Sequence, residues 1–399
     1  MRVTHIITRL VIGGAQENTL ATISGLQKKS GLEVNLISGP TLGPEGSLEN
    51  KAREIFPQLS TLNSNSSQLT ILPELIRPIH PLKDFIALRK LEKILRAQKP
   101  DLVHTHSGKA GILGRLAAKR ARVPIIIHHL HGPSFGKFQN PFANFIFTAA
   151  EKYAARVTGH FFVSANAMTR IYLAAGIGQP EMFTRIFSGF NLQPFLESTN
   201  DLALREKLKI PAGAFVIGKI ARLFKLKGHD DLLRAFAKIL PQIPNARLLF
   251  VGDGALRTQL ENRARELNLS GKVIFAGLVA PNEVARYVGL MDCVAHLSSR
   301  EALSRALPQA LASAKPIVAY DFDGADEICL ENETGFLVRT GDIDTVAQKI
   351  LLLANNSELR KTFGARGQNF VRENFGVEKM VNDQYDWYLK LAAERGLRF

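Results

Sequence analysis

The chain alternates short apolar segments with amphipathic ones along almost its whole length, and this alternation limits the folds open to it. Apolar runs of about four to eight residues are typical of buried strands. Apolar residues at helical spacing, such as Phe85, Leu88, Leu91 and Leu95, indicate helices that pack on those strands. Because strand, helix and strand in this order build a parallel sheet, the sequence predicts an α/β fold with parallel sheets.

The alternation occurs twice. In the first half the predicted strands are residues 3–8, 32–38, 101–106 and 123–129, and the predicted helices are residues 13–27, 84–98 and 109–121. After about residue 200 the predicted strands are residues 214–221, 246–254, 272–277, 293–297, 316–320 and 335–338, with helices at 228–240 and 255–268. Residues 57–81, rich in Ser, Asn and Pro, are predicted to be irregular.

Two such halves predict two α/β domains, residues 1–195 and 196–376, with ligands bound at the carboxyl ends of their strands. A last helix within about 377–399, which carries Trp387 and Tyr388, is expected to pack back on the first domain.

The charge of the chain is lopsided. Residues 1–200 hold 23 Lys and Arg against 12 Asp and Glu, whereas residues 201–399 hold 28 against 24. A basic half attracts nucleic acid, anionic membrane surfaces or acidic substrates, and the alternative is a merely basic surface. No nucleic-acid-binding module or basic–aromatic strip is present, so no nucleic acid partner is expected.

The sequence predicts a cytoplasmic protein. Its two cysteines, Cys293 and Cys329, lie in apolar surroundings, which suits a reducing compartment rather than a disulfide framework. No apolar run approaches the ~18 residues of a membrane span. The apolar N-terminus is interrupted by Arg9 and is interpreted as a first strand rather than a signal peptide.

Two loops have the composition of phosphate-binding segments. Gly13 and Gly14 stand between a strand and a helix, where backbone amides can approach a phosphate; the alternative is a plain tight turn. Arg222 and Lys227 follow a strand and precede a helix, and two cations there suit a diphosphate; the alternative is a solvated basic loop.

A third candidate is the segment 298–320. Pro308 is tolerated in the first turn of a helix, which predicts a helix start near Ser304, a good N-cap residue. Glu301 then precedes the helix, and Gln309 lies in its second turn. Backbone amides beside one carboxylate suit a ligand with both phosphate and hydroxyl groups. The alternative is a salt-bridged surface Glu and a solvated Gln.

Histidines and a DxD pair raise the question of a metal. His104, His106, His128, His129 and His131 fall within 28 residues. Zinc is disfavoured because neighbouring strand residues point to opposite faces and no Cys or carboxylate completes a ligand set. One His is expected to line the cleft, and the others to be structural. Asp321 and Asp323 are interpreted as a polar loop after a strand, against the alternative of a metal-binding DxD.

Together these segments resemble the retaining glycosyltransferases of family 4, which have the GT-B fold of two Rossmann-like domains facing across a cleft. The resemblance covers nearly the whole chain, through the motifs "LVIGGAQ", "HTHSGKAGILGR" with "HHLHG", "ARLFKLKGHDDLLRAF", "LLFVGDGALRTQL", "SSREALSRALPQALASAKPIVAY" and "DGADEICLENETGFLV". It implies a hexosyltransferase that needs no metal or other cofactor.

The resemblance also implies site roles. Arg222 and Lys227 would hold the donor diphosphate and neutralise the leaving group, Gly13 and Gly14 would let the N-terminal loop close on the donor, and His131 would lie beside the reacting sugar. Glu301 would bind sugar hydroxyls. The implied donor contacts are completed by the amides of Leu303 and Ser304 and by Gln309.

Two positions depart from the family pattern. Ala302 stands where the family usually has Gly, and Gln309 replaces a second Glu that binds the ribose. An amide oxygen still accepts a hydrogen bond, although more weakly than a carboxylate. These departures put donor affinity and donor identity in doubt.

The expected function is transfer of a sugar from a nucleotide-diphosphate donor, most readily a UDP-sugar, to a glycan or lipid-linked acceptor. Alternatives are a sugar-nucleotide epimerase and a non-catalytic sugar-nucleotide binder. The basic first half, taken as the acceptor domain, suits an anionic membrane surface and a peripheral location. Phe135, Phe138, Phe142, Phe145 and Phe147 are candidates for lipid or acceptor contact, with core packing as the alternative.

Overall fold

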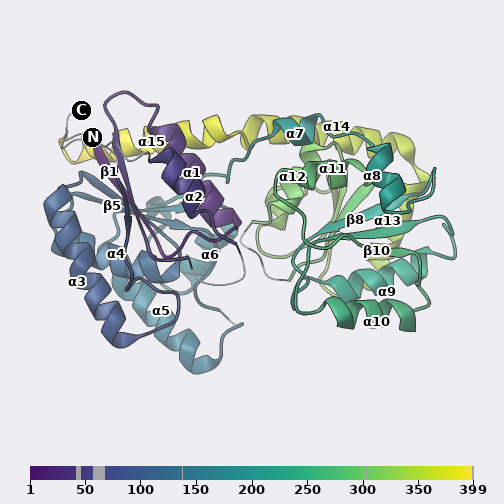
Figure 1. Cartoon of the computed structure of the whole chain (residues 1–399), viewed down its shortest axis with the longest axis horizontal. Helices are drawn as coiled ribbons and strands as arrows, with labels where there is room; N and C mark the ends of the chain where they lie inside the picture. Colours follow the sequence, from purple (N-terminus) through teal and green to yellow (C-terminus); the bar gives the residue numbers. More distant parts are fainter. Residues whose placement is uncertain (42–45, 57–67, 137, 300, 302, 398–399) are drawn as a thin grey trace. The chain divides into compact units, whose positions relative to one another are not determined.

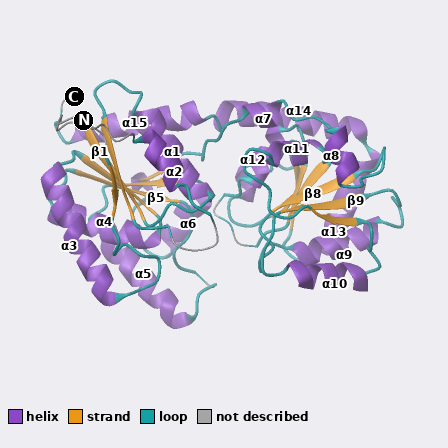
Figure 2. Cartoon of the chain, viewed as in Figure 1, coloured by secondary structure: helices purple, strands orange, loops and turns teal. Residues whose placement is uncertain are grey.

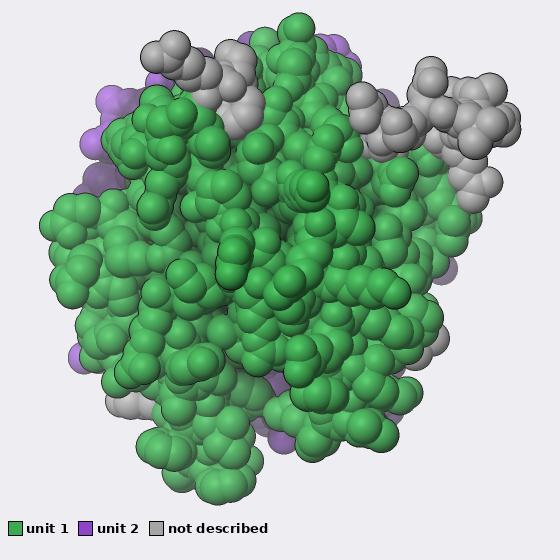
Figure 3. All heavy atoms as spheres, turned by 90° about the vertical axis from the view of Figure 1, so that its left-hand side faces the viewer, with its two compact units in different colours: residues 1–190, 377–399 green, residues 191–376 purple. Residues whose placement is uncertain are grey.

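A computed structural model describes the chain except residues 42–45, 57–67, 137, 300, 302 and 398–399 (Figure 1). The chain forms two compact units: unit 1 comprises Met1–Phe190 with Val377–Phe399, and unit 2 comprises Asn191–Gly376 (Figure 3). The predicted boundary after residue 195 lies inside α7 (Gln193–Leu196). Because α7 contacts α11 and α12 of unit 2, the division falls ahead of this helix.

Unit 1 contains a parallel sheet of seven strands in the order β3-β2-β1-β4-β5-β6-β7. The first strand lies in the middle and the order reverses beside it, as in a Rossmann fold. The strands are β1 (Arg2–Ile7), β2 (Glu33–Ser38), β3 (Leu69–Ile71), β4 (Leu102–His106), β5 (Ile125–Leu130), β6 (His160–Val163) and β7 (Phe183–Arg185).

Helices cover both faces of this sheet (Figure 2). They are α1 (Gly14–Leu26), α2 (Glu49–Ile55), α3 (Pro81–Gln98), α4 (Gly108–Arg120), α5 (Pro141–Ala155), α6 (Asn166–Ala174) and α15 (Val377–Glu394), with a 3-10 turn η1 (Pro180–Met182). Asn140 and His80 cap α5 and α3 through their side chains, and a proline follows each cap, as expected for helix starts.

The last helix, α15, completes the core of unit 1. It packs so closely on α1 that a Cβ atom at Gly25 would lie 2.5 Å from Val381 Cγ2. Tyr388 is fully buried, and its hydroxyl lies 2.5 Å from Nδ1 of His104 on β4. Trp387 stacks on His160 with ring centroids 4.4 Å apart. Residues from the two ends of the chain therefore share one core.

Unit 2 contains a parallel sheet of six strands in the order β10-β9-β8-β11-β12-β13, again the Rossmann order. The strands are β8 (Val216–Ile220), β9 (Arg247–Val251), β10 (Val273–Phe275), β11 (Cys293–His296), β12 (Ile317–Tyr320) and β13 (Gly335–Val338). The remaining helices are α8 (Leu202–Lys207), α9 (His229–Ile239), α10 (Arg257–Glu266), α11 (Val284–Gly289), α12 (Ala306–Ala312), α13 (Ile343–Asn355) and α14 (Ser357–Asn374), with a 3-10 turn η2 (Ala325–Glu327).

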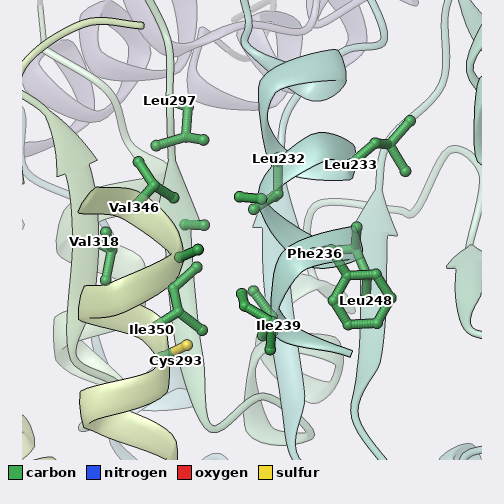
Figure 4. Close-up of a cluster of buried hydrophobic side chains, with 14 of the residues drawn as sticks. Leu232, Leu233, Phe236, Ile239, Leu248, Cys293, Leu297, Val318, Val346 and Ile350 are labelled. Carbon is green, nitrogen blue, oxygen red and sulfur yellow. The ribbon is translucent and has the colours of Figure 1, made fainter. Parts of the chain in front are cut away.

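One face of this sheet is covered by α9 and α13, which contact each other. Figure 4 shows apolar side chains of both helices, including Leu232, Phe236 and Ile350, beside residues of the strands such as Val318. The amphipathic pattern of the two helices thus provides the core of unit 2.

The two parallel sheets confirm the predicted fold class. The prediction that residues 57–81 are irregular is wrong at β3, while residues 57–67 lie outside the described part of the chain. Sequence periodicity also missed β6 and β7. These strands have three or four residues, too few for a period to show. In the residues that can be described, every helix is too short or too polar to cross a bilayer.

The core of unit 2 contains a lysine. Lys219, on the central strand β8, is 1 % exposed, and no described group accepts a hydrogen bond from its Nζ. Burial above all, and then the charge of Lys227, lower its pKa from 10.5 to about 7, while Glu301 and Asp231 oppose the shift. A lysine whose charge is so poorly compensated reduces the stability of the fold at neutral pH.

We expect Lys219→Met to raise the free energy of unfolding near pH 7. Between about pH 7 and 10.5 the unfolded chain holds a proton that folded Lys219 lacks, so the natural protein gains stability as the pH rises. The free energy of unfolding of the Met variant, measured by urea unfolding at several pH values, should lack this rise. Lys238→Met, at an exposed lysine of α9, is the control. Lower stability of Lys219→Met at pH 7 would contradict this account.

Candidate functional site

The strand order of unit 2 reverses between β8 and β11, so the loops after these strands start side by side at one edge of the sheet. Open parallel sheets bind ligands at such a switch point. The loops cover residues 221–228 and 297–305. They carry five of the implied donor residues: Arg222, Lys227, Glu301, Leu303 and Ser304.

The two loops are fastened together by backbone contacts. Gly228 has φ +67°, and a Cβ atom there would lie 1.8 Å from the carbonyl oxygen of Leu297. Only glycine fits this left-handed position at such close approach. The Ser299 N–H also donates to the Leu226 carbonyl at 2.9 Å. The glycine of the "LKGH" motif therefore sets the separation of the two loops.

Lys227 and Glu301 form an ion pair at this junction, with Lys227 Nζ donating to Glu301 Oε1. Their side chains are 17 % and 30 % exposed, so the pair remains open to solvent. The Glu301 N–H donates to Asp323 Oδ2 at 2.8 Å, which ties the loop after β12 to the other two. This contact agrees with Asp321–Asp323 as a polar loop at a strand end.

Glu301, Leu303 and Ser304 line one small cavity together with other residues of the strand ends: His296, Ser298, Leu307, Phe322, Gly324 and Ala325. His296 is buried, and burial holds its pKa well below the usual range, so its ring is neutral at pH 7. The cavity has a volume of about 10 Å³, room for about one water molecule, and combines a carboxylate and hydroxyl groups with an apolar wall.

The helix that follows begins near Ser304, as predicted. α12 is assigned from Ala306, Arg305 already has helical backbone angles, and the Ser304 Oγ accepts the Ala306 N–H at 3.3 Å, as an N-cap side chain does. Pro308 lies in the first turn, as predicted. Gln309 is half-buried in the next turn and lies apart from the residues that line the cavity. Ala302 lies outside the described residues.

Arg222 begins the same loop that Lys227 ends. Its guanidinium lies 5.0 Å from the centre of the Phe224 ring, a cation–π contact, and its side chain is exposed. The structure therefore brings Lys227 and Glu301 into direct contact and leaves Arg222 on the surface of the loop.

In unit 1 the strand order reverses between β1 and β4. Gly13 caps α1 and Gly14 is its first residue, after the loop that leaves β1. The backbone of Gly13 has φ 174°, an extended conformation that any residue adopts. The two glycines thus lie at a helix mouth as predicted, but Gly13 is not required there by its backbone angles.

His131 follows β5 and lines a cavity of about 230 Å³ with Ser107, Gly108, His128, His129, Leu130, Gly132, Pro133, Ser134 and Tyr172. Burial lowers the pKa of His131 to about 3, so the imidazole is neutral at pH 7. Its Nε2 lies 3.1 Å from His106 Nδ1, and its ring stacks on His129 at 4.1 Å.

The sequence analysis did not identify the contacts or the burial of three residues in these regions. His5 pairs through Nδ1 with His106 Nε2 at 2.9 Å, yet lies 101 residues away along the chain. Asp323 was interpreted as a polar loop residue without its partner Glu301, and Lys219 was treated only as part of a strand. The available signal for His5 was its place on a strand whose neighbour carries two histidines.

Comparisons with known proteins agree with this architecture. The family described as "Glycosyl transferase 4-like domain" matches residues 13–184, and "Glycosyl transferases group 1" matches residues 200–370. The Escherichia coli UDP-Gal:alpha-D-GlcNAc-diphosphoundecaprenol alpha-1,3-galactosyltransferase is 25 % identical over 99 % of this chain and 98 % of its own. The Staphylococcus aureus capsular polysaccharide biosynthesis glycosyltransferase CapM is 25 % identical over 79 % and 84 %.

Among solved structures, Anabaena HepE in complex with UDP has a TM-score of 0.81 and 21 % identity, covering 98 % of this chain and 100 % of HepE. This similarity shows a shared fold. The two family matches fall in unit 1 and unit 2 respectively, in the order required by a two-domain enzyme. The chain therefore belongs to the GT4-like family of GT-B glycosyltransferases.

Proposed function

We propose that this glycosyltransferase uses a UDP-sugar, retains the configuration of the sugar, and needs no metal to bind the donor. The Lys227–Glu301 pair at the switch point of unit 2 carries the proposal. Lys227 can bind the donor diphosphate as a point charge, and Arg222 can bind it as a fork. Built-in cations of this kind stabilise the charge that develops on the departing UDP.

Donor binding would exchange one partner of Lys227 for another. In the structure, Lys227 pairs with Glu301. A diphosphate that recruits Lys227 would release Glu301 to accept hydrogen bonds from sugar hydroxyls, beside Leu303 and Ser304, which lie close to Glu301. His131 would lie beside the reacting sugar, the glycine pair Gly13–Gly14 would face the donor, and Gln309 would bind the ribose through its amide.

UDP as the nucleotide is supported by relatives. The Escherichia coli relative is named for a UDP-galactose donor, and HepE was solved with UDP. The family matches do not favour the two alternatives, a sugar-nucleotide epimerase and a non-catalytic binder, since both matched families are glycosyl transferases.

Two substitutions should separate nucleotide binding from transfer. Lys227→Met is expected to weaken UDP binding by about tenfold or more, the loss of a charge-assisted contact, in thermal-shift titration. Glu301→Gln is expected to keep or strengthen UDP binding, because Lys227 loses its competing partner, while transfer from a UDP-sugar falls by about 100-fold.

Lys225→Met is the matched control, since Lys225 is an exposed lysine of the same loop. Titration with UDP, GDP and ADP shows the base preference, and UDP is expected to give the largest shift. Equal UDP affinity in the two lysine variants, or full transfer by Glu301→Gln, would refute these roles.

We also propose a lipid-linked acceptor, reached from an anionic membrane surface through unit 1. The Escherichia coli relative is named for a diphosphoundecaprenol acceptor. On α5, Phe142 and Phe145 are 75 % and 72 % exposed, and Ile146 is also exposed, so three apolar side chains form a helical stripe. Phe135, by contrast, is buried in the core.

Helix α3 adds charge on the same face of the sheet, because α3 and α5 both contact α4. Leu82 and Phe85 of α3 are exposed. The helix also carries a set of basic residues: Lys83, Arg89, Lys90, Lys93 and Arg96. Exposed apolar and basic side chains on one face are typical of proteins that lie on anionic membranes.

The double variant Phe142→Ser/Phe145→Ser is expected to bind phosphatidylglycerol vesicles about tenfold more weakly than the natural protein in flotation. The reason is that it lacks two aromatic rings that would be buried in the membrane. Binding of the natural protein should fall with added salt. Leu278→Ser in unit 2, where Leu278 is 84 % exposed, should not change binding. Absence of binding to these vesicles at low salt would refute the membrane proposal.

A further inference from the structure

Five histidines gather on one face of three neighbouring strands in unit 1. The register pairs His5 of β1 with His104 of β4, and His106 of β4 with His129 of β5. His131 lies two residues beyond His129 and therefore points to the same face. His128 points to the other face, where its Nδ1 contacts Thr105 Oγ1 at 2.9 Å. Consecutive ring centroids lie 4.1–5.8 Å apart.

Two overlapping sets of three offer ligand atoms close enough for one ion. The first, His5–His104–His106, is completely buried, and His104 Nδ1 is taken by the Tyr388 hydroxyl. The second, His106–His129–His131, opens on the cavity of about 230 Å³, which His129 and His131 line. The second set therefore has an entry path for an ion.

The separation of two nitrogens in the second set is close to that of two ligands on a tetrahedral metal. His106 Nδ1 and His131 Nε2 lie 3.1 Å apart. Two imidazole nitrogens on one tetrahedral Zn²⁺ at ~2.05 Å are separated by about 3.3 Å. All three ligand atoms lie within 4.8 Å of one another. The His129 and His131 rings are stacked at 4.1 Å, so both can bind one ion only if one ring turns out of the stack.

His129 provides the second observation. It is fully buried, and neither of its ring nitrogens has a hydrogen-bond partner among the described residues. Such a buried polar group is costly, and a bound metal ion would satisfy it. In the tautomer that donates the His106 Nε2–H to His5 Nδ1, the lone pair on His106 Nδ1 faces His131 Nε2, and an ion bound between these two nitrogens would replace their hydrogen bond. Ligating histidines commonly have such an outer hydrogen bond.

We propose that His106, His129 and His131 form a binding site for a divalent transition-metal ion, Zn²⁺ above all. Imidazole ligands favour Zn²⁺, Co²⁺, Ni²⁺ and Cu²⁺ over Mg²⁺ or Ca²⁺. Three histidines would leave a fourth position for water or another ligand, and His129 and His131 line a cavity through which it could enter. The three histidines are not the residues to which the proposed function assigns the donor diphosphate, which are cations of unit 2.

Co²⁺ titration tests the site directly, with the full chain purified without a polyhistidine tag. Tetrahedral Co²⁺ has strong visible absorption, and we expect one equivalent to bind and to be displaced by Zn²⁺. His129→Phe keeps a ring stacked on His131 but offers no ligand, so the absorption should disappear. His129→Ala repeats the test in case Phe disturbs packing, and circular dichroism checks that each variant is folded.

Two controls locate the ion. His80→Ala removes an exposed histidine of unit 1 and should leave Co²⁺ binding unchanged. His5→Asn separates the two sets, because His5 belongs only to the deeper one. Loss of the absorption in His5→Asn with retention in His129→Phe would overturn the proposal in favour of the deeper set. No tetrahedral Co²⁺ signal in the natural protein would overturn it altogether.

A consequence for catalysis rests on the proposed function. A Zn²⁺ ion on His131 would occupy the imidazole beside the reacting sugar, so Zn²⁺ should slow sugar transfer and a chelator should restore it. The inhibition should be lost in His129→Phe, which leaves His131 in place. Co²⁺ binding does not depend on turnover, so it still reports the metal site if the protein proves to use another donor.

Discussion

Parallel pairing of β8 with β11 is the interaction on which the candidate donor site of unit 2 depends. The register joins Cys293 to Ile217 and Val294 to Gly218, and both strands then end at one edge of the sheet. Residues 74 positions apart in the chain, Lys227 and Glu301, thereby become neighbours. A slip of one residue would turn the side chains of β11 to the opposite face and separate the loops.

The sequence predicted most of this because parallel sheets impose simple rules. Strand ends could be recognised from apolar runs, and cations and carboxylates that follow them were expected to gather. The resemblance then assigned Lys227 and Glu301 to one site, and the structure brings them into contact. Gly228 shows what sequence alone could not predict. Its motif can be recognised in the sequence, but its contact with Leu297 depends on how the two loops cross.

Other features could not be predicted because they depend on register or on very short elements. His5 meets His106 only through the pairing of β1 with β4. Strand β3 has three residues and relies on hydrogen bonds from β2 rather than on its own pattern.

The return of the chain to unit 1 has a consequence for folding during synthesis. Unit 2 is continuous, so it can fold once residue 376 has emerged from the ribosome. Unit 1 begins first but lacks Met380, Val381 and Tyr388 of its core until α15 is made. Its sheet must therefore wait, with an apolar face uncovered, while unit 2 is translated. The first domain to be synthesised is the last to be finished.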